Sequence, residues 1–316
     1  LARAKEEPIR VLQTGAVSVG MKGMELTDFE ALVKAGACGF TDDGIPLTDE
    51  KLVEEAMQRA KALDLPLSFH EEDPVFIEKP GTNRTAPAIA EDIMVARDCM
   101  LALHTGATID IQHISSKNSV ALVRTAKKLG APVFAEATPH HFTLTENAVE
   151  TYGTYAKMNP PLRTRKDVEA LIEGLKEGYI QVISTDHAPH TLKDKTGSMR
   201  TAAFGIVGIE TSFALSYTAL VETGILTLSQ LVEKMSLNPA RILRIPKGTL
   251  AEGCCADLCI ADPNEEYTVS GPFYSKASNT PFIGWKMKGR IRTTILEGKV
   301  IYQDYQMLLK EEEIND

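Results

Sequence analysis

Apolar runs of strand length alternate with helix-like segments through the first two thirds of this 316-residue chain. The runs cover residues 9–17, 37–41, 65–70, 107–113, 131–137 and 179–185. The segments between them are long enough to be crossover helices; in residues 28–35, for example, Phe29, Leu32 and Val33 recur at helical spacing. Helical crossovers join parallel strands, whereas hairpins join antiparallel ones. The alternation predicts an α/β fold built on a parallel sheet.

Side chains that could carry chemistry follow four of these runs at their carboxyl ends. They are Asp43, His70, His113 and Asp186. A (β/α)8 barrel brings the carboxyl ends of all its strands to one mouth, where barrel enzymes hold their catalytic residues. The alternative is a doubly wound open sheet of six strands, which has its site at one reversal of strand order. Residues spread over four strands favour the barrel.

A (β/α)8 barrel needs eight strands, and this chain supplies six. If residues 179–185 form the last strand, residues 9–17 form the third, and the first two β/α units are absent. The chain also opens at Leu1 with no initiator Met. We therefore expect a TIM-type (β/α)8 barrel that lacks its amino-terminal portion.

The pattern changes near Gly248, where short strands separated by glycine and proline turns replace the alternation. These strands are expected at residues 256–261, 266–269, 285–288, 290–297 and 299–302. Residues 310–316 read as an acidic, solvated tail. The expected division is a barrel domain over residues 1–245, with the metal and substrate site, and a small β-sandwich-like domain with the tail over residues 246–316.

The composition narrows the class of partner. A net charge of -9 argues against a nucleic-acid surface, which would need clustered Lys and Arg. The sequence has no apolar run of the roughly 20 residues that cross a bilayer. Its five cysteines form no C-x-x-C pair and are expected to be reduced thiols rather than metal ligands. We expect a cytoplasmic enzyme that acts on a small molecule and binds neither nucleic acid nor membrane.

Imidazoles and carboxylates at one barrel mouth indicate a metal site, because zinc binds both and in catalytic sites keeps a position for an activated water. The predicted ligands of one or two divalent ions are Asp43, His70, His113 and Asp186. Asp42 could replace Asp43, but alternation along a strand sends only one of the two inward, and Asp43 is preferred. Asp186 is also the predicted general base, which would take the proton of the attacking water.

Several motifs together resemble one known family. The motifs are Phe40-Thr41-Asp42-Asp43-Gly44, Phe69-His70-Glu71-Glu72-Asp73, Ala137-Thr138-Pro139-His140-His141, Lys157-Met158-Asn159-Pro160-Pro161-Leu162-Arg163, Thr185-Asp186-His187-Ala188-Pro189-His190 and Phe204-Gly205-Ile206-Val207-Gly208. From about residue 9 to the end, the chain resembles the bacterial dihydroorotases of the amidohydrolase superfamily. It is similar to the branch in which an Asp stands where relatives have a carboxylated Lys.

The resemblance implies a role for each matching residue. Asp43 would bridge two ions, His70 and His113 would bind the second ion, and Asp186 would bind the first. Substrate contacts are implied for Asn159, His190, Phe204 and Gly205. The implied reaction is the reversible, zinc-dependent conversion of (S)-dihydroorotate to N-carbamoyl-L-aspartate in pyrimidine biosynthesis, by a homodimer that could associate with aspartate transcarbamoylase.

The chain departs from this family at one point. Dihydroorotases carry a His-x-His pair and an Arg on the first barrel strand, and none of the seven histidines here forms such a pair. The stretch from Asp73 to Ala88 is also shorter than in the family. We expect this polypeptide to be inactive by itself. The alternatives are another cyclic amidase, such as a hydantoinase, dihydropyrimidinase or allantoinase, and an inactive dihydroorotase-like partner of aspartate transcarbamoylase.

Overall fold

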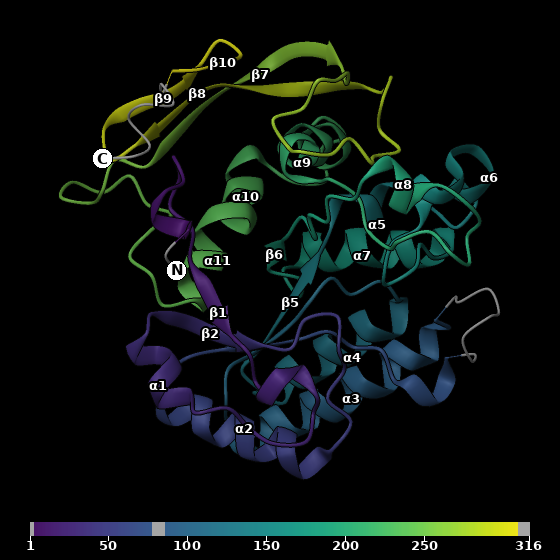
Figure 1. Ribbon diagram of the computed structural model, residues 1–316, viewed down its shortest axis with the longest axis vertical. Helices are drawn as coiled ribbons and strands as arrows, with labels where there is room; N and C mark the ends of the chain where they lie inside the picture. The colour runs from purple at the N-terminus through teal and green to yellow at the C-terminus, as the bar shows by residue number, and fades with distance from the viewer. Residues whose placement is uncertain (1–2, 78–85, 309–316) are drawn as a thin grey trace.

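The computed structural model describes residues 3–77 and 86–308, and two β-sheets organise them (Figure 1). The acidic tail at 310–316 and part of the stretch from Asp73 to Ala88 lie outside the described residues. The first sheet has six parallel strands in the order β1-β2-β3-β4-β5-β6. The strands are β1 (Gln13–Gly15), β2 (Ala37–Thr41), β3 (Leu67–Phe69), β4 (Ile109–Ile111), β5 (Val133–Ala137) and β6 (Val182–Ile183).

The order of these strands in space follows their order in the sequence, without reversal. A doubly wound sheet reverses its order at the switch point, so that alternative is wrong. Because parallel crossovers are right-handed, a sequential order sets the connecting helices on one face of the sheet, as in part of a barrel. The fold is therefore an α/β half-barrel, and all six strands expected from the sequence are present, although all of them except β2 are shorter than expected.

Helices follow most of the strands of this sheet. They are α1 (Phe29–Lys34), α2 (Glu50–Ala62), α3 (Ala88–Thr105), α4 (Lys117–Lys128), α5 (Pro139–Thr143), α6 (Ala148–Tyr152), α7 (Arg165–Glu177), α8 (Leu192–Lys195), α9 (Ile209–Ser216), α10 (Leu228–Val232) and α11 (Asn238–Ile242). Local signals begin and end the longer ones. The Asp49 carboxylate caps α2 by accepting hydrogen bonds from the backbone of Lys51 and Leu52, and the left-handed Gly106 ends α3.

The main core lies between the sheet and its helices, and a second core lies under the C-terminal strands. In the main core the rings of Phe29 and Phe40 stack with centroids 3.9 Å apart. The second core joins Phe282 and Met287 from the C-terminal part to Ile206 and Leu215 from the half-barrel. Burial of apolar surface therefore holds the two sheets together.

The second sheet is antiparallel, in the order β10-β9-β8-β7, and lies beyond α9, which packs against β8 (Figure 1). Its strands are β7 (Leu258–Thr268), β8 (Lys286–Leu296), β9 (Lys299–Gln303) and β10 (Gln306–Met307). The expected breaks within 256–269 and 285–297 were wrong, since each segment is one strand. β7 continues through register shifts between Ile260 and Glu266, and Gly289, with φ +85°, lies within β8.

Candidate metal centre

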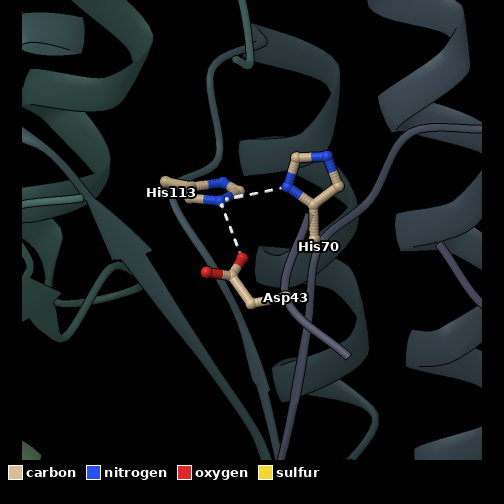
Figure 2. A group of neighbouring side chains, drawn as sticks. All are labelled: Asp43, His70 and His113. Carbon is tan, nitrogen blue, oxygen red and sulfur yellow. Dashed lines mark hydrogen bonds and ion pairs between the residues drawn. The ribbon is translucent and has the colours of Figure 1, made fainter. Parts of the chain in front are cut away.

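Asp43, His70 and His113 come together just beyond the carboxyl ends of β2, β3 and β4, three neighbouring strands. One ligand atom from each lies within 4.8 Å of the other two. His70 Nδ1 is 3.2 Å from His113 Nε2, and that same nitrogen of His113 is 3.8 Å from Asp43 Oδ1. Figure 2 shows the three side chains pointing toward one another. Among the described residues this is the group of side chains that could hold a metal ion.

The donor set fits a zinc-sized ion. Two ligands bound at about 2.0–2.1 Å in a tetrahedron lie about 3.3 Å apart, close to the separation of the two histidine nitrogens. Both imidazoles are buried, while the Asp43 side chain is half-exposed. Two nitrogens and one carboxylate oxygen are a ligand set found in zinc hydrolases, with a further position left for water.

The charges around His113 favour a cation. Burial opposes its protonation, but the Asp43 carboxylate 3.8 Å away and the charge of Asp186 outweigh this and raise the pKa of His113 to about 9. The nearby His113 imidazole holds the pKa of Asp43 below its usual range. Burial raises the pKa of Asp186 to about 6. The site therefore attracts positive charge, whether a proton or a metal ion carries it.

Asp186 follows β6 and is not part of the three-residue group. It lies close enough for its charge to act on His113. Asp186 and His113 have left-handed backbone, with φ of 45° and 32°. This conformation is uncommon outside glycine and, where the surrounding structure enforces it, often marks a functional site.

The two neighbouring aspartates after β2 have different environments. The Asp42 carboxylate is buried and accepts hydrogen bonds from the backbone N–H of Val17 and Ser18, at 2.8 and 3.1 Å, and from the Ser18 hydroxyl. Asp42 therefore anchors the loop after β1, and Asp43 is the aspartate beside His113.

The side chain of Asn159 lies against the metal group. Its Nδ2 is 3.1 Å from His70 Nε2 and 2.6 Å from Glu72 Oε2. This contact joins residues 89 positions apart in the sequence, and it brings a side chain with one donor group and one acceptor group next to the candidate ligands.

His190, Phe204 and Gly205 lie together in the loops after β6. The Gly205 N–H donates to Lys157 O at 2.9 Å, and Lys157 Nζ lies 4.1 Å from the centroid of the Phe204 ring. Gly205 has φ +102°, and a Cβ there would lie 2.4 Å from Ala188 Cβ, so the position requires glycine. These three residues lie close to one another, and a Cβ at Gly205 would lie 3.8 Å from His190 Nε2.

Two buried residues that sequence reasoning missed hold these loops. Asn279 accepts a hydrogen bond from His190 N–H at 3.0 Å and donates to Ala188 O and Gly205 O at 3.0 and 3.1 Å. Lys195 Nζ donates to Gly205 O at 3.0 Å. A lysine is rarely buried without partners, but no local pattern around either residue indicates which backbone groups it binds.

His140 and His141 are both buried in α5, the short helix that follows β5. His141 Nδ1 accepts from the Thr138 hydroxyl at 2.7 Å, and its Nε2–H donates to Pro160 O at 2.8 Å. Burial lowers the pKa of His141 to about 3 and that of His140 well below its usual value. His141 is therefore neutral, and in this form its hydrogen bond to Pro160 O holds the segment that carries Asn159.

Acid should destabilise the chain through these two histidines. A histidine that stays neutral in the fold but is protonated once unfolded removes stability as the pH falls below about 6.5, by about 1.4 kcal/mol per pH unit. Urea unfolding of the metal-free chain between pH 7 and 5 measures this slope. Proton uptake by the folded Asp186, whose pKa is about 6, offsets part of this slope below pH 6. His141→Gln should lower the slope by up to about 1.4 kcal/mol per pH unit, and the exposed control His104→Gln should leave it unchanged. An unchanged slope in His141→Gln would contradict the prediction.

Comparison with known proteins agrees with this geometry. Residues 4–301 match the family model described as Amidohydrolase family. The chain is 53% identical to a dihydroorotase of Clostridioides difficile (strain 630) over 310 residues, covering 95% of this chain and 73% of the relative. The chain belongs to the dihydroorotases of the amidohydrolase family. A dihydroorotase of Clostridium acetobutylicum is 48% identical over 313 residues, covering 96% of this chain and 74% of the relative.

Solved amidohydrolase structures share the fold of this dihydroorotase family member. An L-hydantoinase (dihydropyrimidinase) from Arthrobacter aurescens superposes with a TM-score of 0.84 at 25% identity, covering 95% of this chain and 71% of that one. A D-hydantoinase superposes with a TM-score of 0.81 at 24% identity, covering 95% of this chain and 72% of that one. Separately, none of the helices within residues 3–77 and 86–308 has the length and apolarity needed to span a bilayer.

Proposed function

We propose that this chain contributes the second-metal ligands, the general base and the substrate-binding loops to the reversible, zinc-dependent opening of (S)-dihydroorotate to N-carbamoyl-L-aspartate. The observation that carries the proposal is the convergence of Asp43, His70 and His113, with Asp186 beside them, in a member of the dihydroorotases. Zinc in one or two sites is the proposed cofactor, because the donor set is nitrogen and oxygen.

An ion held by Asp43, His70 and His113, with Asp186 as a ligand of a further ion where two are bound, would supply an activated water and polarise the scissile carbonyl. Asp186 takes the proton of the attacking water as the new C–O bond forms. It returns that proton to the ring nitrogen as the C–N bond breaks, so no net proton is consumed within the step. In the reverse direction the same residue moves the proton the opposite way, and the ring closes with loss of water.

Asn159 and the loops after β6 bind the substrate. Dihydroorotate has a carboxylate and ring amides, and these need both donors and acceptors. Asn159 supplies an amide next to the metal group, His190 supplies an imidazole, and the backbone of Phe204 and Gly205 supplies further donors and acceptors. Asn279 hydrogen-bonds to the backbone of both His190 and Gly205 and so holds their two loops together, which supports a shared role for these loops in substrate binding.

We also propose that the complete protein folds as a (β/α)8 barrel, in which two further β/α units join the six strands of this chain. Within the described residues, β1 and β6 each have one edge without a partner strand. A cavity of about 640 Å³ borders Asp43 and is lined by side chains of the sheet, including Thr41, Ser68 and Glu136. Further strands between β6 and β1 would close this cavity and carry the His-x-His pair and Arg of the family. Residues 1–245 and 246–316 are the proposed domains.

The reaction is tested in an extended protein, in which this chain is joined at Leu1 to the amino-terminal residues of the Clostridioides difficile relative. With zinc, the extended protein should turn over dihydroorotate at least tenfold more efficiently, as kcat/KM, than hydantoin, whereas the 316-residue chain alone should turn over neither. Preference for hydantoin would favour the alternative cyclic amidase, and no turnover by the extended protein would favour an inactive partner.

A further inference from the structure

Glu72 lies between a candidate metal ligand and a candidate substrate residue. It follows His70 by two positions, and its side chain is 5% exposed. One oxygen, Oε2, is 3.2 Å from His70 Nε2 and 2.6 Å from Asn159 Nδ2. Both contacts therefore converge on a single carboxylate oxygen in a nearly dry environment, where charge-assisted hydrogen bonds are strong.

The two nitrogens of His70 have different partners. Nδ1 faces His113 Nε2 and so belongs to the metal group, while Nε2 faces Glu72. A neutral imidazole has one N–H, and the nitrogen that binds a metal must be the other one. The hydrogen bond to Glu72 therefore selects the form of His70 with the proton on Nε2, which leaves Nδ1 bare toward the ion.

The same carboxylate orients Asn159. An amide that donates from Nδ2 to Glu72 has its Oδ1 on the opposite side of the amide plane, where it can accept a hydrogen bond from an N–H group. Asn159 Nδ2 and His70 Nε2 both donate to the same oxygen, Glu72 Oε2, and this shared acceptor brings the two nitrogens within 3.1 Å of each other. Glu72 also excludes the flipped orientation of the Asn159 amide, because that orientation would place Asn159 Oδ1 against Glu72 Oε2.

We propose that Glu72 is a positioning residue that fixes the tautomer of His70 for metal binding and the amide orientation of Asn159 for substrate binding. Glu72 does not bind the ion itself, because it lies on the Nε2 side of the ring, away from the metal group. The proposal rests on the proposed function, since it assumes that His70 is a ligand. Such supporting carboxylates typically contribute 10- to 100-fold to metal affinity.

The test is zinc affinity of this chain, measured by competition with a chromophoric chelator. Glu72→Gln should weaken binding 10- to 100-fold, because a neutral amide is a poorer acceptor and can also present its NH₂ group to His70. Glu173→Gln, the same change at an exposed position of α7, should leave the affinity unchanged. Equal affinity in Glu72→Gln and wild type would overturn the proposal. A wild-type chain that binds no zinc would instead count against the proposed function.

The tautomer of His70 gives a second test, which can be read from the wild-type chain alone. In ¹⁵N-detected NMR of the wild-type, zinc-loaded chain, His70 should show its proton on Nε2, and the Asn159 side-chain amide should show a strongly hydrogen-bonded proton. In Glu72→Gln both signals should shift, while those of His141 should not. A proton on Nδ1 of His70 in the wild-type chain would overturn the proposal whatever the variant does.

Discussion

Asp186→Asn is expected to lower kcat of the extended protein by about 10³- to 10⁴-fold. Asparagine has nearly the same shape as aspartate but cannot take a proton from water and return it to the leaving nitrogen, a role that contributes up to about 10⁴-fold in enzymes. Asp186 lies near His113 but outside the three-residue group. Its loss should therefore affect the rate far more than zinc binding at Asp43, His70 and His113.

The experiment compares kcat and bound zinc in the same preparations. Asp304→Asn makes the same chemical change in an exposed turn and should retain wild-type kcat. If Asp186→Asn kept more than a tenth of the wild-type rate, another group would have to be the base. If the variant lost all its zinc as well, Asp186 would be mainly a ligand, and the division of roles proposed here would be wrong.

His113→Ala should weaken zinc binding to this chain by more than 100-fold. His113 is the central member of the group, since its Nε2 contacts both His70 Nδ1 and Asp43 Oδ1. Removing it takes away one ligand of three and leaves the other two without their shared neighbour. The loss should exceed the 10- to 100-fold expected for a supporting residue such as Glu72.

Zinc-dependent stability gives an independent measurement. A ligand present at 100 times its dissociation constant stabilises the folded state by about 2.7 kcal/mol. Wild-type chain should gain this stability when zinc is added and lose it with a chelator, and His113→Ala should show neither change. The exposed control His104→Ala should behave like wild type. Full zinc stabilisation of His113→Ala would place the metal site elsewhere.

Much of the half-barrel could be predicted because its signals are local. Each strand is a short apolar run, and Asp43, His70 and His113 follow their strands by one or two residues, so knowing the strands nearly determines where these three side chains meet. Side-chain alternation allowed only one of Asp42 and Asp43 to face inward, and spacing favoured Asp43; the structure has Asp42 bound to the loop after β1.

The remaining features depend on contacts between distant segments. Asn279 binds His190 across 89 positions, and no periodicity or turn signal encodes such a pair. The bulges that let β7 and β8 run through glycine and polar residues look like turns in the sequence, because both use the same residue types. The short helix α5, which buries His140 and His141 after β5, has no clear start or end signal in the sequence beyond Pro139.

Asn279 lies in the connection between β7 and β8, outside the half-barrel, yet its three hydrogen bonds set the backbone of the loops with His190 and Gly205. The connection between β7 and β8 therefore fixes loops that we propose to bind the substrate. A graft of the antiparallel sheet from a hydantoinase onto a dihydroorotase would replace this support as well, unless the 270–285 connection were left in place.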